Sequence, residues 1–438
     1  MDQEILYPVL NPNYVLVKQF GESIIYPLAE ADKNRPVSSH YIYEYMTKSA
    51  CDVLSLCDGS RSLENTYRAI KELYPDASYS SVYNFVMASH RKEHLLLSEK
   101  PVKGYKPRIY GDYKLYSPIR AIIEVTKMCP LHCIHCFNQS GDKRTEEMTL
   151  DEIKRVIDIF VYLGIQKIMI TGGEAFARSD IFRIIDYCAD KFIAIAIASN
   201  GYLIDAPCAD ILSKYKHKIA MQISLDGGEK SHNKIRGKKD SFEKAINAIH
   251  LLSMRGIPVI VAMTLNADNF GDMDLVAEIA CRNGAKQLSF ALTFNLGRAK
   301  DGVNIDIDLN KLTENAIRLQ KEYVTKGLYI IVEGEAERST NIEKPQGSCG
   351  AGVTSICIRE NGDVAPCVSF DYVMGNILKD DIHVLFSPER LDKFSRIKIE
   401  KGDCLKCNDC NNCYGCKALA YDIKNKTCSW YKCFSDCM

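Results

Sequence analysis

The chain has 438 residues, and this length predicts two or three domains rather than a single core. Its 56 acidic and 56 basic side chains balance, so no excess charge favours nonspecific binding to nucleic acid or to a membrane surface. The first ten residues lack the apolar core of a signal peptide, and no stretch is long and apolar enough to span a bilayer. We therefore expect a cytoplasmic protein, in which the 19 cysteines indicate metal sites rather than disulfides.

The first hundred residues predict a hairpin followed by three helices. Two apolar runs between Tyr14 and Pro27 flank Gly21, which is a hairpin signal. Helical periodicity then recurs at residues 42–56, 63–73 and 80–90. This order is that of a small winged-helix domain, which we place at residues 1–104.

The phrase Leu56-Cys57-Asp58-Gly59-Ser60-Arg61-Ser62, followed by an amphipathic helix, resembles the PqqD-like peptide-recognition domains that accompany ribosomal-peptide maturation enzymes. This resemblance implies that the domain binds an extended leader peptide, which adds a strand along the edge of the hairpin. The alternatives are a DNA-binding winged helix and a packing subdomain. Arg68, Lys71 and Arg91 are scattered among acids, so no basic stripe favours DNA.

Residues 105–117 show no sustained periodicity and are expected to form a linker. From residue 118 to residue 305, apolar runs alternate with amphipathic stretches. The predicted strands are 121–125, 167–170, 193–198, 219–223, 258–263 and 287–292, and the predicted helices are 150–163, 180–191, 241–254 and 273–283. Strands alternating with helices at this spacing predict an α/β fold with parallel strands, here a partial (β/α)6 TIM-like barrel. In such barrels the site lies at the carboxyl ends of the strands.

Three cysteines, Cys129, Cys133 and Cys136, follow the first predicted strand with the spacing C-x3-C-x2-C. Three thiolates in so short a loop can hold one face of a cubane iron-sulfur cluster and leave its fourth iron open. The alternative is a zinc knuckle, in which only His132 and His135 could complete the ligands locally. The spacing resembles that of the radical S-adenosylmethionine (SAM) superfamily, with His135 where an aromatic residue is usual.

Thr171-Gly172-Gly173-Glu174 follows the second predicted strand, and its two glycines let the backbone approach a ligand closely. At this position it matches the motif with which radical SAM enzymes hold the methionyl amino group, although Ala175 stands where proline is usual. By spacing alone, the polar turns after the next two strands are more typical of helix caps than of ligand sites. The resemblance implies that further SAM contacts are made by Ser199, Asn200, Ser224, Arg236 and the backbone near Leu292. Arg236 would pair with the methionyl carboxylate, and Leu292 would face the adenine.

Cysteines return after a bridging region at residues 306–345, and we place a third domain at residues 346–438. Their order resembles the SPASM extension, which holds two auxiliary 4Fe-4S clusters; the alternative is a pair of zinc sites. The resemblance implies ligands Cys349, Cys357, Cys367 and Cys416 for the first auxiliary cluster and Cys404, Cys407, Cys413 and Cys428 for the second. Cys357 stays open, because the first cluster could lack a fourth protein ligand, and Cys433 and Cys437 compete with Cys428.

Taken together, the three domains resemble the sactipeptide maturases of the subtilosin type. This resemblance implies an enzyme that cleaves SAM to a 5′-deoxyadenosyl radical and installs a thioether or carbon-carbon crosslink in a ribosomally made precursor peptide. It also implies three 4Fe-4S clusters and a low-potential electron donor such as flavodoxin or ferredoxin. The alternatives are a formylglycine-type maturase of a protein substrate and an iron-sulfur DNA-binding redox sensor. The first has no use for the N-terminal domain, and the barrel-length middle domain argues against the second.

Overall fold

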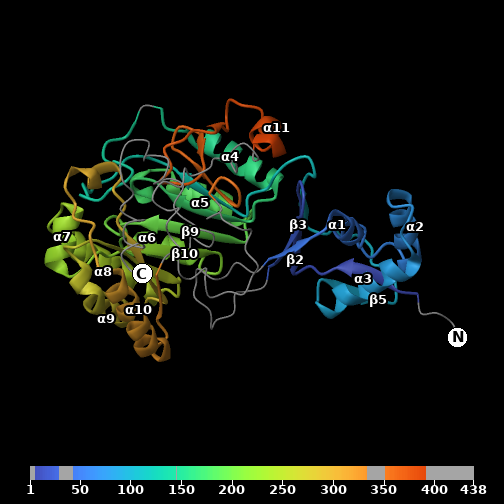
Figure 1. Cartoon of the computed structure of the whole chain (residues 1–438), viewed down its shortest axis with the longest axis horizontal. Coiled ribbons are helices and arrows are strands. Elements are labelled where there is room, and N and C mark those ends of the chain that lie inside the picture. The colour runs from blue at the N-terminus through green and yellow to red at the C-terminus, as the bar shows by residue number, and fades with distance from the viewer. Residues whose placement is uncertain (1–4, 29–42, 145, 333–350, 391–438) are drawn as a thin grey trace, which may run out of the picture.

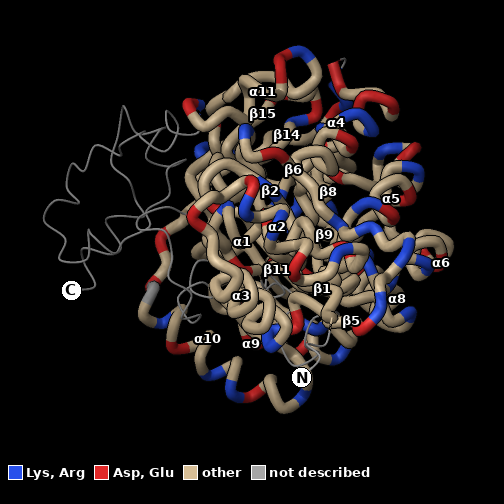
Figure 2. Tube along the Cα trace, turned by 90° about the vertical axis from the view of Figure 1, so that its right-hand side faces the viewer, with Lys and Arg blue, Asp and Glu red and all other residues tan. Residues whose placement is uncertain are grey.

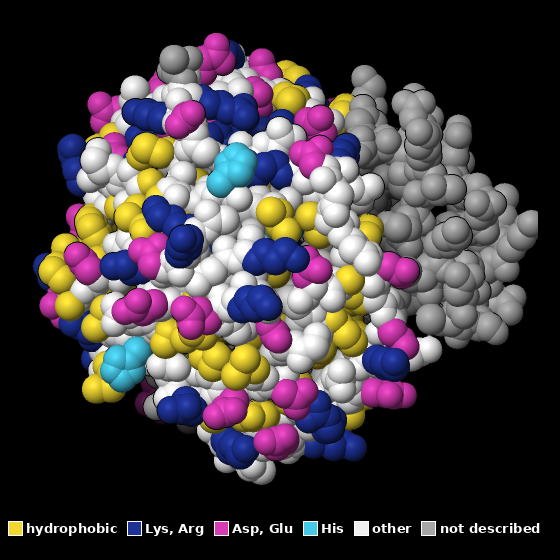
Figure 3. Space-filling model, turned by 90° about the vertical axis from the view of Figure 1, so that its left-hand side faces the viewer, with side chains coloured by type: hydrophobic (Ala, Val, Ile, Leu, Met, Phe, Trp, Pro, Cys, Tyr) yellow, Lys and Arg dark blue, Asp and Glu magenta, His cyan; other side chains and the backbone are white. Residues whose placement is uncertain are grey.

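The structure is a computed structural model that describes residues 5–28, 43–144, 146–332 and 351–390. A sheet flanked by helices forms the larger lobe, and the N-terminal residues form a smaller lobe beside it (Figure 1). Basic and acidic residues are intermixed along the described chain (Figure 2) and over the face in Figure 3, in keeping with the balanced composition. Among the described residues, no helix is both long and apolar enough to cross a lipid bilayer.

Within the described residues, ten strands form the central sheet in the order β13-β12-β11-β10-β9-β8-β7-β14-β15-β16. The first seven of these are mutually parallel. They are β7 (Arg120–Glu124), β8 (Lys167–Thr171), β9 (Ala194–Ser199), β10 (Ile219–Ser224), β11 (Val259–Leu265), β12 (Gln287–Leu292) and β13 (Tyr329–Val332). The six strands predicted from the sequence are β7 to β12, so the alternating pattern is confirmed, whereas β13 was not predicted.

The helices of the larger lobe cover this sheet and bury one continuous apolar core against it. They are α4 (Leu150–Leu163), α5 (Ile181–Ala189), α6 (Ala206–Ser213), α7 (Glu229–Arg236), α8 (Ser241–Met254), α9 (Met273–Arg282) and α10 (Leu309–Tyr323). Short 3-10 helices lie at η2 (Ala175–Ala177), η3 (Phe270–Asp272), η4 (Gly297–Asp301) and η5 (Val324–Lys326). Helix α4 matches its prediction because Thr149 and Glu152 form a capping box and Gly164, at φ +84°, ends it.

The other edge of the sheet is built by the C-terminal part of the chain. It contains β14 (Ser355–Ile358), β15 (Asp363–Ala365), β16 (Gly375–Asn376) and the short helix α11 (Ile382–Leu385). Strand β14 pairs in parallel with β7, and β15 returns antiparallel to it. The carboxyl end of β14 therefore lies at the same edge of the sheet as the carboxyl end of β7.

The smaller lobe contains the predicted hairpin and helices, with two corrections. Its elements are β1 (Tyr7–Leu10), β2 (Tyr14–Lys18), β3 (Ser23–Pro27), β4 (Glu44–Met46), α1 (Lys48–Ser55), α2 (Leu63–Leu73), α3 (Tyr79–Arg91), β5 (Leu95–Ser98) and β6 (Ile109–Gly111). Residues 44–46, expected to be helical, form a strand on β3, and residues 109–111, expected to be linker, form a strand on β2. Pairing with a distant strand overrides the local pattern in both places. Both edges of the β2–β3 hairpin are consequently occupied by strands of this chain.

The smaller lobe contacts the amino-terminal end of the barrel strands. A Cβ added to Gly164, just before β8, would lie 2.6 Å from a methyl carbon of Val17 on β2. The Lys167 ammonium at the start of β8 lies 5.8 Å from the centre of the Tyr26 ring. The carboxyl ends of the strands, where the predicted site residues lie, are at the opposite edge of the sheet.

Candidate functional site

The cysteine loop follows the carboxyl end of β7, and two of its sulfurs lie near nitrogen donors from the turn after β9 and from helix α7. The side-chain amide of Asn200, after β9, lies 3.6 Å from the Cys129 sulfur. A guanidinium nitrogen of Arg236, at the end of α7, lies 3.8 Å from the Cys133 sulfur. Donors placed in this way favour the thiolate form that iron requires.

The environment of the loop fits an iron-sulfur cluster. The pKa of Cys129 is raised to about 12, chiefly by burial and in smaller part by Glu174 and the neighbouring thiols; burial also raises the pKa of Cys133. Adjacent thiolates in such a place need a compensating cation, which the irons of a cluster would supply. Among the described residues, no three His, Cys, Asp or Glu side chains lie close enough together to hold a single metal ion. A cubane is larger and reaches thiolates that are further apart.

The Gly172-Gly173 turn packs directly against the start of this loop. A Cβ added to Gly173 would lie 2.5 Å from the carbonyl oxygens of Lys127 and Met128. The Gly173 amide donates to the Thr126 carbonyl at 2.7 Å, and the Glu174 amide donates to the Met128 carbonyl at 2.8 Å. Only glycine fits there, so the turn after β8 and the cysteine loop form one surface.

Glu174 is buried at the centre of this surface and organises the turn after β9. Its carboxylate accepts hydrogen bonds from the Ser199 hydroxyl at 2.9 Å and from the Asn200 amide at 2.7 Å. Burial raises its pKa, although these bonds and one from the Phe176 amide oppose the shift. Two of the predicted SAM contacts, Ser199 and Asn200, thus meet a third, Glu174.

A buried ionic group at the end of β10 lies next to the cysteine loop. Asp226 is fully buried, and one of its carboxylate oxygens lies 2.7 Å from Arg236 and 3.2 Å from the His135 imidazole. Burial alone would raise the pKa of Asp226, but Arg236 and then His135 hold it well below its usual range. The other carboxylate oxygen accepts from the Thr264 amide on β11 at 3.0 Å. In the sequence alone, Asp226 is only part of the polar turn after the fourth predicted strand.

The Arg236 guanidinium is therefore already engaged by Asp226 and lies close to Cys133. Its pairing with a methionyl carboxylate stays a prediction. Ser224 and Leu292 are the last residues of β10 and β12, so both lie at the carboxyl edge of the sheet. Their roles also stay predictions.

Arg298, which no sequence motif marks, also contacts the cysteine loop. Its Nε donates to the Cys133 carbonyl at 2.8 Å, its Nη1 donates to the Ser140 carbonyl at 2.9 Å, and its amide donates to the Cys136 carbonyl at 3.1 Å. A lone arginine after the sixth strand carries no local signal, because its partners lie far away in sequence.

Comparisons with known proteins agree with this geometry. The model of the radical SAM superfamily matches residues 123–279, and that of the SPASM iron-sulfur cluster-binding domain matches residues 349–414. The sporulation killing factor maturation protein SkfB of Bacillus subtilis (strain 168) is 30% identical over 300 residues, which are 68% of this chain and 71% of SkfB. The chain belongs to the radical SAM peptide maturases that carry a SPASM domain. The prediction that it is an enzyme is confirmed.

Two further proteins are similar to nearly the whole length of this radical SAM maturase. The antilisterial bacteriocin subtilosin biosynthesis protein AlbA of the same organism is 28% identical over 447 residues, 98% of this chain and 97% of AlbA. Crystal structures of Streptococcus suis SuiB, bound to SAM or to its precursor peptide SuiA, align with a TM-score of 0.69 and 17% identity. They cover 96% of this chain and 97% of SuiB, which shows a shared fold.

Of the predicted auxiliary-cluster ligands, Cys357 and Cys367 lie in the described part of the maturase. Cys357 lies on β14 and is fully buried. Its neighbours Ile356 and Ile358 belong to the apolar core, so Cys357 points to the opposite face of the sheet. Burial raises the pKa of Cys357, and the nearby Glu124 and Cys367 raise it further. The other predicted ligands, Cys349, Cys404, Cys407, Cys413, Cys416 and Cys428, lie outside the described residues, as do Cys410, Cys433 and Cys437.

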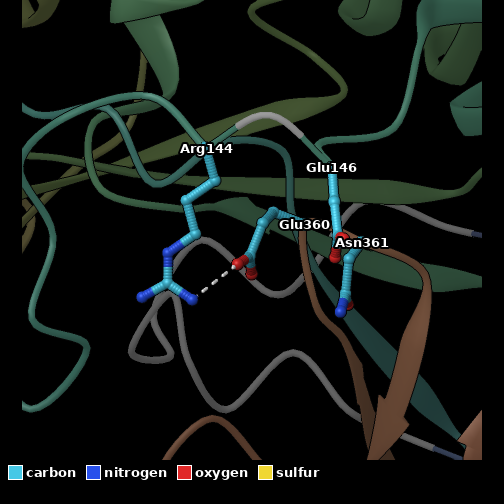
Figure 4. Close-up of a pocket in the computed structure, with 4 residues that line it drawn as sticks. All are labelled: Arg144, Glu146, Glu360 and Asn361. Atoms are coloured by element: carbon cyan, nitrogen blue, oxygen red, sulfur yellow. Dashed lines mark ion pairs between the residues drawn. The ribbon is translucent and has the colours of Figure 1, made fainter.

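A polar network joins this C-terminal segment to the cysteine loop. Lys127, two residues before Cys129, lies 3.0 Å from Glu124 and 3.5 Å from Glu360, and it also donates to the Asn138 side chain. Glu360 lies in the turn after β14 and pairs with Arg144 at 3.4 Å, as Figure 4 shows. Arg144, Glu146, Glu360 and Asn361 line a cavity of about 250 Å³ at this junction.

Proposed function

We propose that this enzyme uses SAM and an iron-sulfur cluster to install an intramolecular crosslink in a ribosomally made precursor peptide. The observation that carries the proposal is the joined surface of the cysteine loop and the Gly-Gly-Glu turn, in which Asn200 contacts both Cys129 and Glu174. The likeness to AlbA over nearly the whole chain supports the class of substrate.

In this proposal Cys129, Cys133 and Cys136 hold a 4Fe-4S cluster. When bound, the cluster and SAM supply a 5′-deoxyadenosyl radical that takes a hydrogen from the peptide. Glu174 offers a buried carboxylate to the methionyl ammonium. Ser224, Arg236 and the backbone near Leu292 complete the proposed SAM contacts. The chain's own contribution is to hold and orient these groups and to exclude water from them.

The N-terminal residues 1–104 are proposed to be a winged-helix domain that binds the precursor's leader peptide. Support comes from the three helices and small sheets of this lobe and from its place beside, not within, the barrel. Because β4 and β6 occupy both edges of the β2–β3 hairpin, an added strand would join the outer edge of β4 or displace it. Residues 118–305 and 346–438 are the proposed barrel and auxiliary-cluster domains, with 105–117 and 306–345 between them.

Two auxiliary 4Fe-4S clusters are proposed for the C-terminal domain, which gives three clusters in all. The first would use Cys349, Cys357, Cys367 and Cys416, and the second Cys404, Cys407, Cys413 and Cys428. For the first set, the support is that Cys357 points away from the apolar core and that Cys367 lies near enough to raise the pKa of Cys357. An auxiliary cluster would accept the electron left after crosslinking, and a low-potential donor such as flavodoxin or ferredoxin would supply the electron that SAM cleavage requires.

The central claim is tested by replacing Cys129, Cys133 and Cys136 together with alanine. We expect the loss of one cubane, about four irons per chain, together with the loss of SAM cleavage. Replacing the buried Cys188 with alanine is the matched control, because this thiol packs in the core of α5 and should leave both measurements unchanged. Deoxyadenosine formation at the wild-type rate by the triple variant would refute the proposal.

The role of the N-terminal domain is tested by deleting residues 1–104. We expect modification of leader-bearing peptide to stop while slow, uncoupled SAM cleavage continues, because the deleted domain contributes no cysteine to the loop. Mass spectrometry of the peptide and chromatography of deoxyadenosine measure the two activities separately. Equal peptide turnover by the truncated enzyme would contradict leader binding.

A further inference from the structure

The segment after β12 forms hydrogen bonds with the backbone of the cysteine loop, and no sequence motif marks this contact. Three donors of Arg298 reach three carbonyls of the loop, those of Cys133, Cys136 and Ser140, at 2.8 to 3.1 Å. The first two of these carbonyls belong to proposed cluster ligands. Arg298 thus bonds the two ligand residues and the end of the loop at once.

Gly297 lets the backbone of this segment approach the loop closely enough for these hydrogen bonds. It adopts φ +54°, and a Cβ at this position would lie 2.4 Å from the carbonyl oxygens of Cys136 and Phe137. A side chain would therefore push the two segments apart. The glycine and the arginine together keep the segment after β12 in direct contact with the loop.

The carbonyls of Cys133 and Cys136 accept longer hydrogen bonds from amides of the loop than from Arg298. The Cys136 amide reaches the Cys133 carbonyl at 3.3 Å, and the Gln139 amide reaches the Cys136 carbonyl at 3.3 Å. Gln139 also adopts φ +48°, which is uncommon for a residue other than glycine. Charged donors at shorter distances hold carbonyls more firmly than neutral amides at the edge of the hydrogen-bonding range. The Cys129 amide closes the loop on the Gly141 carbonyl at 2.7 Å, but the carbonyls of Cys133 and Cys136 are held mainly by the external arginine.

We propose that Arg298 is a positioning residue that fixes Cys133 and Cys136 relative to each other, so that a cluster held there presents its open iron to SAM. Arg298 differs from Arg236, which lies against a sulfur, because the partners of Arg298 in the described part of the chain are backbone oxygens. It also follows Leu292 by six residues, so the segment expected near the adenine continues into the one that holds the loop. Occupation of the SAM site and the geometry of the loop are coupled through this segment.

This inference rests on the proposed cluster in the cysteine loop, and its test uses the intact enzyme purified without oxygen. Arg298→Ala and Arg298→Lys are compared with the wild type by electron paramagnetic resonance of the reduced enzyme during SAM titration. The rate of iron loss to a chelator is the second measurement. Arg255→Ala is the matched control, because Arg255 also donates to two backbone carbonyls, those of Leu251 and Ala206, but on helices away from the loop.

For Arg298→Ala we expect the SAM-dependent spectral change to require about tenfold more SAM, and iron loss to accelerate about fivefold, since charge-assisted bonds to the loop are lost. Arg298→Lys keeps the positive charge, but a lysine ammonium cannot bond two carbonyls with the planar geometry of a guanidinium. We therefore expect its SAM requirement and its rate of iron loss to lie between those of the wild type and Arg298→Ala. Arg255→Ala should match the wild type in both measurements. A purely structural role for Arg298 would lower the unfolding temperature without moving the SAM titration.

A wild-type titration curve and chelation rate in Arg298→Ala would overturn the positioning role. If Arg298→Ala does not fold, a wild-type curve for the conservative Arg298→Lys would overturn it equally. Absence of any SAM-dependent spectral change in the wild type would instead refute the proposed cluster, so the two failures are distinguishable.

Discussion

Glu174 and Asp226 are both fully buried carboxylates, yet their surroundings shift their pKa values in opposite directions. Glu174 receives neutral donors from Ser199 and Asn200, so burial dominates and its pKa rises. Asp226 lies against Arg236 and is held in the ionised form. The negative charge of Asp226 is therefore already compensated by Arg236, whereas a negative charge on Glu174 would be stabilised by a bound cation. This difference supports Glu174 as the site of the methionyl ammonium.

At the scale of single residues, Glu174→Gln tests this assignment. The amide keeps the size of the side chain and removes its charge, so we expect SAM affinity to fall by at least about tenfold, as when a charge-assisted bond is lost. The unfolding free energy should fall by only about 1 kcal/mol, because an oxygen remains to accept from the Asn200 amide. Isothermal titration with SAM measures the affinity. Glu152→Gln, in the capping box of α4, serves as the control, and equal affinities in both variants would contradict the assignment.

At the scale of elements, the ion pair between Lys127 and Glu360 joins β7 to β14. Both side chains are buried, and each has a second partner: Lys127 lies 3.0 Å from Glu124, and Glu360 lies 3.4 Å from Arg144. We expect Lys127→Met to destabilise the enzyme by about 3 kcal/mol, because it leaves the buried Glu124 without its cation, and Glu360→Gln to cost less, because Lys127 keeps Glu124. The double variant should cost less than the sum of the two, because the attraction between Lys127 and Glu360 is lost only once. Urea denaturation of the four enzymes measures the coupling, and strictly additive losses would show that the pair does not join the strands.

At the start of β8, Lys167 lies at the contact between the two lobes. Burial lowers its pKa from 10.5 to about 8, so between these pH values the unfolded chain binds more protons than the folded one. Stability should therefore rise with pH across this window, by up to about 3 kcal/mol for this group. Below pH 8 both states are protonated and this dependence ends.

Lys167→Met should remove that dependence. We expect the variant to gain most over the wild type near pH 7.5 and to lose this advantage as the pH approaches 10.5. Denaturation at a series of pH values checks the trend, with the exposed Lys326→Met as the control. A difference between variant and wild type that does not change with pH would show that Lys167 is not desolvated in the folded enzyme.

At the scale of the whole molecule, the smaller lobe and the candidate site lie at opposite ends of the barrel. Lys167, which contacts Tyr26, begins β8, and Glu174 follows the end of the same strand. Five strand residues at about 3.3 Å each give roughly 17 Å along this path. A peptide bound to the smaller lobe must cross at least this distance before it reaches the site.

The precursor should therefore need a spacer of at least about six residues between its leader segment and the first crosslinked residue, since an extended chain advances about 3.3 Å per residue. Shortening the spacer below this length should abolish crosslinking while uncoupled SAM cleavage continues. Mass spectrometry of a series of shortened precursors gives the threshold. Complete crosslinking of a precursor without a spacer would mean that the leader does not stay on the smaller lobe.

Local patterns in the sequence were enough to predict β7 to β12 and helices α4 and α8. Hydrophobic periods of 2 and 3.6 residues, caps and cysteine spacing are properties of neighbouring residues, so they are readable without the fold. The cysteine loop, the Gly-Gly-Glu turn and their position after parallel strands were predictable for the same reason.

Contacts between distant residues were decided only by the tertiary structure. Residues 44–46 and 109–111 form strands because they pair with the edges of β3 and β2. Strand β14 extends the central sheet by pairing with β7. Arg298 bonds the Cys133 carbonyl although 165 positions separate them in the sequence. Asp226, after β10, contacts His135 in the loop after β7. Such partners leave no period in the chain, because the energy of each contact depends on which residues folding brings together.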